Sequence, residues 1–367
     1  MQRRCTHLEG LLFLGLMFHA LSTHADHLSG GFGIEQTAPI NTESAVPLKQ
    51  GSWTVGVRTD YVNNDSFSDQ ELITLRGIGI NRDGEADEDL HSIDSILGVS
   101  LRAAYGVTEN LTIGFRLPYV DRENIREPEE GHAHAPNPIV IHDIIEHGDG
   151  AGIGDTTFFG QYRFYNDATS DIAALFGVKT PTGETGKEGF ERERSVSPSF
   201  VTNVFPSGEE GGHHHEGTLL ETHQQPGSGS WDGILGLAYS RSMGPVNFDT
   251  SILYTVVSEG SQDTDLGDVF NYNFAVSHPT KAFVPCQACS WNLVLELNGE
   301  WRDKEERGDV DVGNSGGHVL YLAPGVRFIG PGGWNMAISA GYPVVNDLNG
   351  DQSEPDYRIV GTVNFNF

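Results

Sequence analysis

Residues 357–367 read YRIVGTVNFNF, a stretch in which large apolar side chains recur at every second position. The apolar positions are Tyr357, Ile359, Val363, Phe365 and Phe367, and the polar positions between them include Arg358, Thr362, Asn364 and Asn366. A repeat of two residues is the period of a β-strand, because successive side chains point to opposite faces. The stretch therefore predicts a strand with one apolar face and one polar face.

The same alternation recurs along the chain and predicts about twelve strands. They lie near residues 53–61, 97–105, 111–119, 158–164, 174–178, 231–239, 246–256, 270–276, 291–301, 320–328, 334–342 and 357–367. No stretch approaches the roughly 18 consecutive apolar residues that a membrane-spanning helix requires. The pattern therefore indicates an all-β protein.

The connections between these segments alternate between short and long. The short ones are 107–110, 166–171, 243–245 and 330–333, with a longer turn at 279–290. The other connections fall near 64–91, 122–150, 183–229, 259–268, 303–317 and 346–355. Short periplasmic turns opposite longer extracellular loops are the anatomy of a transmembrane antiparallel β-barrel. We predict such a barrel over residues 51–367, with both termini on the periplasmic side.

The N-terminal residues predict export. Arg3 and Arg4 precede an apolar run from Leu11 to Leu21, which is the organisation of a secretory signal peptide. We expect residues 1–25 to be removed, residues 26–50 to form a periplasmic segment, and the mature protein to reside in the bacterial outer membrane. Its partners there would be lipid and lipopolysaccharide. The terminal Phe367 resembles the signal that the outer-membrane assembly machinery reads.

Charge and motif content exclude two classes of function. The chain carries 22 basic and 51 acidic residues, a formal net charge of −29, so its surface repels nucleic acid and attracts cations. No paired-carboxylate spacing or nucleophile motif is present. The adjacent Ser277 and His278 would point to opposite faces of a strand. We therefore predict that the protein does not bind nucleic acid and is not an enzyme.

Three stretches carry a family resemblance. They are Gly154-Asp155-Thr156-Thr157, then Lys179-Thr180-Pro181-Thr182-Gly183, then Gly229-Ser230-Trp231-Asp232. Between about residues 152 and 254 the chain resembles the outer-membrane transporters named for the meta-pathway of phenol degradation. The resemblance implies an outer-membrane barrel with a transport role. The long His-rich loops depart from that family and put a phenolic substrate in doubt.

If the apolar face contacts lipid, the other face lines the lumen. The predicted lumen-facing residues are Arg58, Asp60, Arg102, Arg116, Gln161, Arg163, Lys179, Asp249, Glu296, Glu300, Arg327 and Arg358. About 8 strands leave an interior that side chains just fill, while 16 to 18 leave an aqueous channel. A twelve-stranded barrel is compatible with a pore for small solutes or with a lumen that ion pairs or loops close. The sequence leaves this choice, and the identity of the solute, open.

Histidines gather in two of the predicted extracellular loops, among many carboxylates. They are His132, His134, His142 and His147 in one loop and His213, His214, His215 and His223 in the other. Imidazole and carboxylate together suit Zn²⁺, Cu²⁺ or Ni²⁺, although no fixed ligand spacing is present. No cofactor is required. The hypotheses for the protein are a channel whose loops capture such metals and a metal-binding surface protein in which the barrel is only an anchor. For the loops themselves, the alternatives to metal capture are a solvated polar loop and pH sensing by the histidines.

Two cysteines, Cys286 and Cys289, lie in the one long periplasmic turn. An oxidising compartment favours a disulfide between them. A two-thiolate metal site is the alternative, and it would have to be kept reduced.

Overall fold

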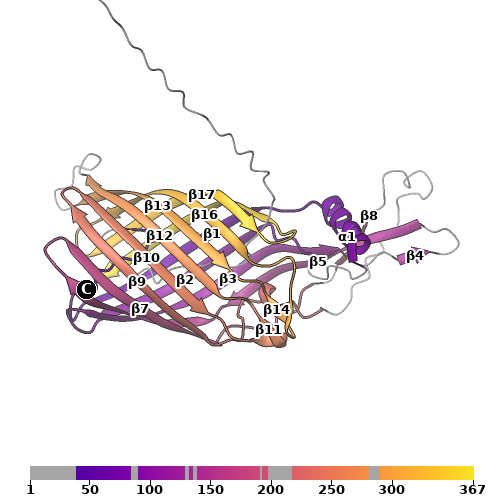
Figure 1. Ribbon diagram of the computed structural model, residues 1–367, viewed down its shortest axis with the longest axis horizontal. Helices are drawn as coiled ribbons and strands as arrows, with labels where there is room; N and C mark the ends of the chain where they lie inside the picture. The colour runs from indigo at the N-terminus through magenta and orange to yellow at the C-terminus, as the bar shows by residue number, and fades with distance from the viewer. Residues whose placement is uncertain are drawn as a thin grey trace, which may run out of the picture.

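A computed structural model of the chain describes residues 39–83, 90–128, 132–134, 139–190, 192–196, 217–280 and 289–367. Over these residues the chain forms a β-barrel (Figure 1). The C-terminus lies at one end of the barrel, and helix α1 (Asp69–Asp83) lies beyond the other end. The end with the C-terminus is the periplasmic end and the end with α1 is the extracellular end, as predicted from loop length.

Twelve antiparallel strands form the barrel wall. They are β1 (Trp53–Asp65), β2 (Ser95–Gly106), β3 (Leu111–Pro128), β6 (Thr156–Asn166), β7 (Ser170–Thr180), β9 (Asp232–Met243), β10 (Val246–Val256), β12 (Val269–Thr280), β13 (Ser290–Arg302), β16 (Gly317–Ile329), β17 (Trp334–Leu348) and β18 (Glu354–Asn366). The wall closes because β1 pairs with both β2 and β18, with Thr54 opposite Asn366. The prediction of about twelve strands, with the last closing against the first, is confirmed.

The alternation read from the sequence separates the two faces of the wall. In β1 the side chains of Thr54, Arg58 and Asp60 are buried inside the barrel, while Trp53 and Val57 are 46% and 43% exposed on the outside. On the neighbouring strands, exposed apolar side chains likewise stand at alternate positions. Such a continuous apolar outer surface requires lipid around it. The barrel is therefore one of the bacterial outer membrane.

Aromatic side chains cluster at the periplasmic ends of the strands. The ring of Phe328 lies 4.9 Å from Trp291 and 5.2 Å from Trp334, centroid to centroid. Trp53 and Tyr105 form a second pair at 4.7 Å. Rings at this level can place an apolar body in lipid and a polar edge in the headgroup layer.

The remaining elements lie mostly at the extracellular end. They are β4 (His132–His134), β5 (Ile139–Ile153), β8 (Arg192–Val196), β11 (Thr264–Asp265), β14 (Glu306–Arg307), β15 (Val310–Asp311) and the short helices η1 (Thr222–Gln224) and η2 (Ser261–Asp263). Strand β5 pairs with the outer part of β3 and with β8. The segment expected as the loop 122–150 is therefore largely strand. Beyond the membrane a strand has no lipid to face, so the apolar alternation no longer marks it.

Helix α1 occupies part of the segment expected as the loop 64–91. It begins with a capping box, in which the Ser68 N–H and hydroxyl both donate to the Glu71 carboxylate, over 2.8 and 2.6 Å. These hydrogen bonds lower the pKa of Glu71. Among the described residues, no helix is both long and apolar enough to cross a membrane.

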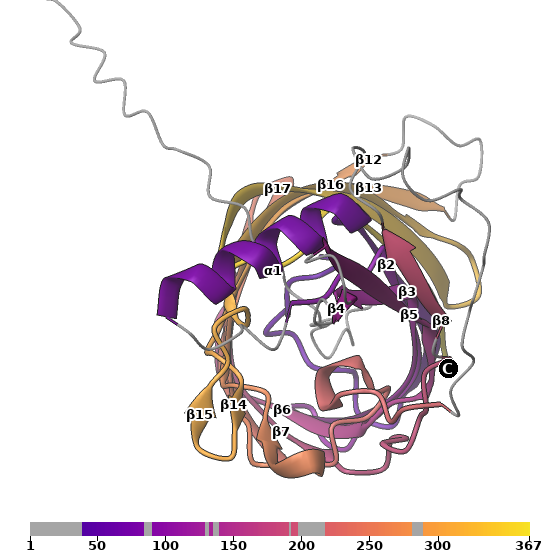
Figure 2. The same cartoon turned by 90° about the vertical axis from the view of Figure 1, so that its right-hand side faces the viewer.

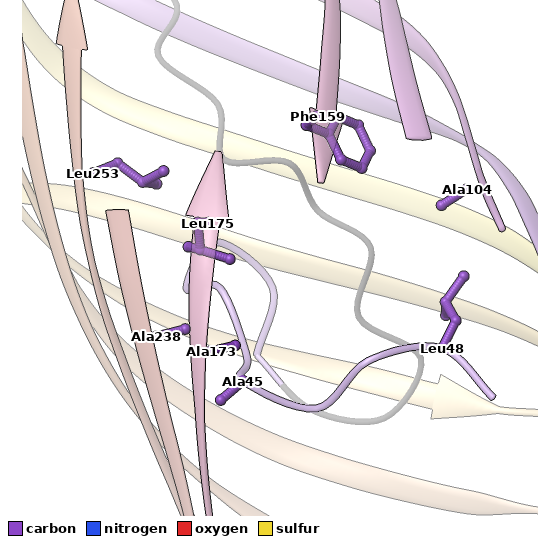
Figure 3. Close-up of a cluster of buried hydrophobic side chains, with 8 residues drawn as sticks. All are labelled: Ala45, Leu48, Ala104, Phe159, Ala173, Leu175, Ala238 and Leu253. Carbon is purple, nitrogen blue, oxygen red and sulfur yellow. The ribbon is translucent and has the colours of Figure 1, made fainter. Parts of the chain in front are cut away.

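The segment before β1 differs most from expectation. It was predicted as part of a periplasmic segment over residues 26–50, whereas its described residues lie inside the barrel. Ala45 and Leu48 pack there against Phe159, Leu175 and other inward-facing side chains (Figure 3). A view into the extracellular end shows this indigo segment within the ring of strands (Figure 2).

Candidate functional site

The segment 39–50, called the plug below, is held in the lumen by Glu296 of β13. The Glu296 carboxylate accepts hydrogen bonds from the backbone N–H groups of Ile40, Asn41 and Thr42, each at 3.0 Å. The Asn41 side-chain amide donates to the other carboxylate oxygen at 2.7 Å. Glu296 is only 1% exposed, and a buried carboxylate needs such a set of donors to offset its lost hydration.

Side chains from strands around the wall bind the rest of the plug. The pairs are Arg327 with Pro39, Arg58 with Ile40, Ser251 with Glu43, Ser240 with Ala45 and Thr112 with Leu48, at 2.6, 2.9, 3.2, 2.8 and 2.8 Å. In each pair a side chain of the wall meets a backbone group of the plug. The plug is therefore attached by individual hydrogen bonds rather than by strand pairing.

An ion-pair network supports these contacts. Arg58 donates two hydrogen bonds to the Asp60 carboxylate, at 2.7 and 2.8 Å, and Arg358 of β18 donates a third at 2.6 Å. All three side chains lie inside the barrel. The two guanidinium groups neutralise Asp60 and fix the Arg58 side chain that holds the plug.

A second segment, residues 217–231, enters the barrel from the extracellular end and is called the inward loop below. Asp155, which lies in the gap between β5 and β6, holds it. The Asp155 carboxylate accepts hydrogen bonds from the Ser228 N–H at 2.8 Å and the Ser228 hydroxyl at 2.7 Å. Its other oxygen accepts from the Gly183 N–H at 2.8 Å. One carboxylate thus ties the inward loop to the wall and to the segment after β7.

Lys179 of β7 extends this attachment. Its ammonium group donates to the Ser228 hydroxyl at 2.7 Å and forms an ion pair with Asp232 of β9 at 2.5 Å. The Ser230 hydroxyl donates to the same Asp232 carboxylate at 2.7 Å. The three stretches that carry the family resemblance therefore meet at one place, where they fasten the inward loop.

Two glycines make this approach possible. A Cβ atom on Gly183 would lie 2.7 Å from the Gly227 Cα atom, and a Cβ atom on Gly227 would lie 2.7 Å from the Gly183 Cα atom. Both distances are too short for a real contact. The inward loop therefore requires glycine on both sides where it crosses the end of β7.

The outer part of the inward loop contacts the short hairpin of β14 and β15. Arg307 forms a two-point ion pair with Glu221, with both N–O distances at 2.9 Å. His223 lies 3.5 Å from the Glu305 carboxylate and stacks on His91, with ring centroids 4.4 Å apart. Three separate loops therefore contribute side chains to one cluster, and through it the loops close over the lumen.

A chamber of ≈ 210 Å³ lies inside the barrel, bounded in part by the inward loop. Its wall residues come from the extracellular halves of their strands, so the chamber lies on the extracellular side of the plug. Basic side chains in its lining are Arg116, Arg122, Lys179 and Arg302, and the acidic ones are Asp60, Asp155 and Asp232. Apolar residues, among them Pro118, Val120, Ile234, Val257, Leu266 and Val269, fill much of the remainder.

The predicted lumen-facing residues separate into several groups. Buried inside the barrel are Arg58, Asp60, Arg102, Gln161, Asp249, Glu296 and Arg327. Asp60, Arg116 and Lys179 line the chamber, and Glu300 and Arg358 line a smaller cavity of ≈ 40 Å³ beside the plug. Arg163 lies near the periplasmic turn that follows β6, with an ion pair to Asp171 at 2.9 Å. The structure adds Arg122, Asp155 and Arg302, which the strand alternation missed because they lie where the strands leave the membrane.

The structure does not bring the predicted metal ligands together where it describes them. His132 and His134 lie in β4, and His142 lies in β5. His147 pairs with Glu127 at 2.8 Å, whereas His223 lies beside Glu305 at 3.5 Å. His213, His214 and His215 lie outside the described residues. Among those that are described, no group of three or more His, Cys, Asp or Glu side chains is arranged to hold a metal ion.

The remaining predictions concern Ser277, His278 and the cysteines. Ser277 is 1% exposed inside the barrel, while the exposed His278 contacts the Pro245 carbonyl oxygen over 3.0 Å, so the two side chains point apart. Cys289 is disulfide-bonded and directly precedes β13. Its predicted partner Cys286 lies outside the described residues.

No protein-family model matches this sequence, and comparison with curated proteins finds no significant match. Solved structures of outer-membrane channels and transporters resemble this chain to different degrees. An outer membrane channel from Pseudomonas putida F1 is 12% identical, with a TM-score of 0.55 over 90% of this chain and 100% of that one. The CymD monoaromatic hydrocarbon channel is 10% identical, with a TM-score of 0.44 over 87% and 88%. The P. putida toluene transporter TodX is 8% identical, with a TM-score of 0.43 over 87% and 90%. The chain therefore has the closed twelve-stranded fold of outer-membrane channels.

Proposed function

We propose that the protein is a channel for small solutes in the outer membrane. The observation that supports this most directly is the chamber of ≈ 210 Å³ inside a closed barrel. The inward loop lines this chamber, and the plug crosses the lumen on its periplasmic side. Both segments are attached through side chains such as Glu296 and Asp155. Releasing either segment breaks only its own hydrogen bonds and leaves the ladders between wall strands in place, so either segment can move while the wall stays intact.

The fold and the chain's own motifs support the same proposal. The outer membrane channel from P. putida F1 has the same fold over its whole length. In this chain the stretches that resemble a transporter family do not build a catalytic site. They attach the inward loop to the wall, through Asp155, Lys179 and Gly183. This is the place where a solute coming from outside would have to pass.

The chamber lining favours solutes with an apolar body, such as small aromatic compounds. Pro118 and Val120 of β3 provide an apolar strip, and Ile234 and Val269 add apolar surface from other strands. Ligand sites combine apolar surface with polar groups that set orientation, and the charged side chains of this chamber are such polar groups. Metal capture by the extracellular histidines stays a prediction.

Planar-bilayer recordings test the proposal. The mature protein should give conductance steps, and a variant that lacks residues 39–48 should give larger or longer ones, because the plug would no longer cross the lumen. Folding of both proteins is checked first, from the shift in electrophoretic mobility that an intact barrel shows before heating. If neither folded protein gave steps, the proposal would be wrong.

A further inference from the structure

A row of hydrogen-bonding side chains crosses three neighbouring strands of the wall. Asn273 of β12 stands opposite Asn298 of β13, and Asn298 stands opposite Tyr321 of β16. Side chains directly opposite each other on antiparallel strands are about 4.5–5.5 Å apart at their Cβ atoms. All three line the cavity of ≈ 40 Å³ beside the plug, which Asn41 of the plug also borders. One side of this cavity is therefore formed by two amides and a tyrosine hydroxyl.

Asn271 joins this cavity to the chamber. Val269, Asn271 and Asn273 stand at alternate positions of β12, so their side chains share one face of the strand. Val269 lines the chamber, Asn273 lines the cavity, and Asn271 lines both. Successive residues on one face of a strand are about 7 Å apart. A solute whose apolar body lies against Val269 would therefore place a polar head next to Asn271.

Two carbonyl oxygens of the cavity are open to a ligand that donates hydrogen bonds. The Asn271 amide nitrogen donates to the Glu300 carboxylate at 3.2 Å, and the Asn298 amide nitrogen donates to the Asn273 carbonyl oxygen at 3.0 Å. Only the nitrogen of an amide can donate, so these contacts fix which way both side chains point. Within the described ranges neither remaining oxygen accepts a hydrogen bond. A head group that satisfies both oxygens must supply two donors.

The Tyr321 hydroxyl adds a donor at the same place. Its ring packs over Gly341 of β17, where an added Cβ atom would lie 3.3 Å from the ring, and the Arg358 guanidinium lies over the ring at 6.0 Å from its centre. In the part of the chain that the structure describes, this hydroxyl has no hydrogen-bond partner. A hydroxyl can donate one hydrogen bond. The matching head group therefore also has one acceptor.

The charged side chains of the cavity are already paired. Arg58 and Arg358 both donate to Asp60, and Glu300 accepts from Arg302 at 3.2 Å. A charged head group would bring a further charge into this enclosed space without a counter-charge, which is strongly unfavourable. The cavity therefore favours an uncharged head group.

We propose that the solutes carry a primary carboxamide on a small apolar body, an inference that rests on the proposed channel function. A carboxamide has two N–H donors and one carbonyl acceptor. The N–H groups would donate to Asn271 and Asn298, and the carbonyl oxygen would accept from Tyr321, while the apolar body stays in the chamber against Val269. Because one water needs about 10–15 Å³, a cavity of ≈ 40 Å³ holds about three atoms of that size, which matches a carboxamide and excludes a ring.

The test compares three compounds with the same ring. Benzamide has two N–H donors, acetophenone has nearly the same shape with a methyl group in place of the NH₂ group, and benzoate carries a charge. Saturation-transfer NMR titrations of the protein in lipid nanodiscs measure the Kd of each compound. Each lost hydrogen bond corresponds to about fivefold in Kd, so benzamide should bind the wild type about tenfold or more tightly than either of the others.

Tyr321→Phe removes one hydroxyl and should weaken benzamide binding about fivefold. Asn271→Leu should reduce the preference for benzamide over acetophenone by a similar factor, and the result for Tyr321→Phe decides if Asn271→Leu does not fold. Tyr342→Phe, at a side chain 65% exposed on the outer face of β17, is the matched control and should change nothing. Equal affinities of benzamide and acetophenone for the wild type, no measurable benzamide binding, or wild-type binding by Tyr321→Phe would overturn the proposal.

Conductance in planar bilayers separates this proposal from the channel function. Tyr321-dependent benzamide binding in a folded protein that gives no conductance steps would support the head-group site and overturn the channel function. Conductance steps in a protein that binds benzamide and acetophenone equally would overturn the carboxamide class and leave the channel function in place.

Discussion

The backbone N–H of Ile40 donates a hydrogen bond of 3.0 Å to the carboxylate of Glu296, a residue 256 positions later in the chain. Two further N–H groups of the plug share this acceptor. Each buried N–H left without an acceptor costs about 1–3 kcal/mol. Removing the Glu296 side chain therefore lowers the stability of the plug inside the lumen.

From this relationship we predict that Glu296→Ala opens the channel. The plug should leave the lumen for part of the time, and the open probability in planar bilayers should rise by about tenfold or more, the factor that corresponds to 1.4 kcal/mol. Glu296→Gln keeps one acceptor oxygen and should give a smaller rise. Glu109→Ala, which removes a carboxylate from an exposed periplasmic turn, serves as the control. Wild-type behaviour of Glu296→Ala would show that the plug does not limit conduction.

Asp155→Ala should release the inward loop. The substitution removes the acceptor of three hydrogen bonds, two from Ser228 and one from Gly183. Hydrogen bonds to charged groups contribute about 1.5–3 kcal/mol each. Backbone hydrogen exchange over residues 217–231 should therefore quicken by about tenfold or more, as mass spectrometry of the protein in lipid can measure. Asp356→Ala, at an exposed carboxylate, should leave this exchange unchanged. Unchanged exchange in Asp155→Ala as well would refute the role given to Asp155.

Gly227→Ala tests the close approach of the two glycines. The new Cβ atom would lie 2.7 Å from backbone atoms of Gly183, so the inward loop must shift. Overpacking of this kind typically costs about 1–3 kcal/mol. The free energy of unfolding, measured by urea titration in lipid vesicles, should fall by that amount. Gly186→Ala is the matched control, because no atom lies within 4 Å of its added Cβ atom, and its stability should stay within about 0.5 kcal/mol. Equal stability of the two variants would contradict the packing described here.

The barrel could be predicted from sequence because lipid imposes the pattern. Every strand that crosses the membrane must place apolar side chains outside, so residues such as Val57 and Phe365 mark their strands directly. Beyond the membrane this constraint ends. The outer part of β3, including Arg122, was therefore expected to be loop, and the helix after Ser68 carried no apolar alternation to reveal it.

The plug and the inward loop could not be predicted for a different reason. Their contacts join backbone groups to side chains of distant strands, as Ala45 does with Ser240. A serine at an inward-facing position gives the same sequence pattern whether its hydroxyl contacts water or accepts a hydrogen bond from a buried N–H group. His223 shows the same limit, since its place beside Glu305 and His91 depends on how three connections fold together, and no local spacing records this.

The periplasmic turn after β6 gives a prediction about pH. The Asp167 carboxylate accepts hydrogen bonds from the backbone N–H groups of Thr169 and Ser170 at 2.8 and 2.9 Å and from the Tyr165 hydroxyl at 2.9 Å. These bonds, with the Thr169 N–H foremost, lower the pKa of Asp167 to about 2. Because the folded pKa lies below the ordinary value near 3.8, the stabilisation is present above about pH 4 and is lost as pH falls through 2. Carbon-13 NMR of the aspartate carboxyl groups should show one group titrating near pH 2, and Asp167→Asn should remove that signal. A lowest midpoint near 4, with no change in the variant, would contradict the hydrogen bonding of this turn.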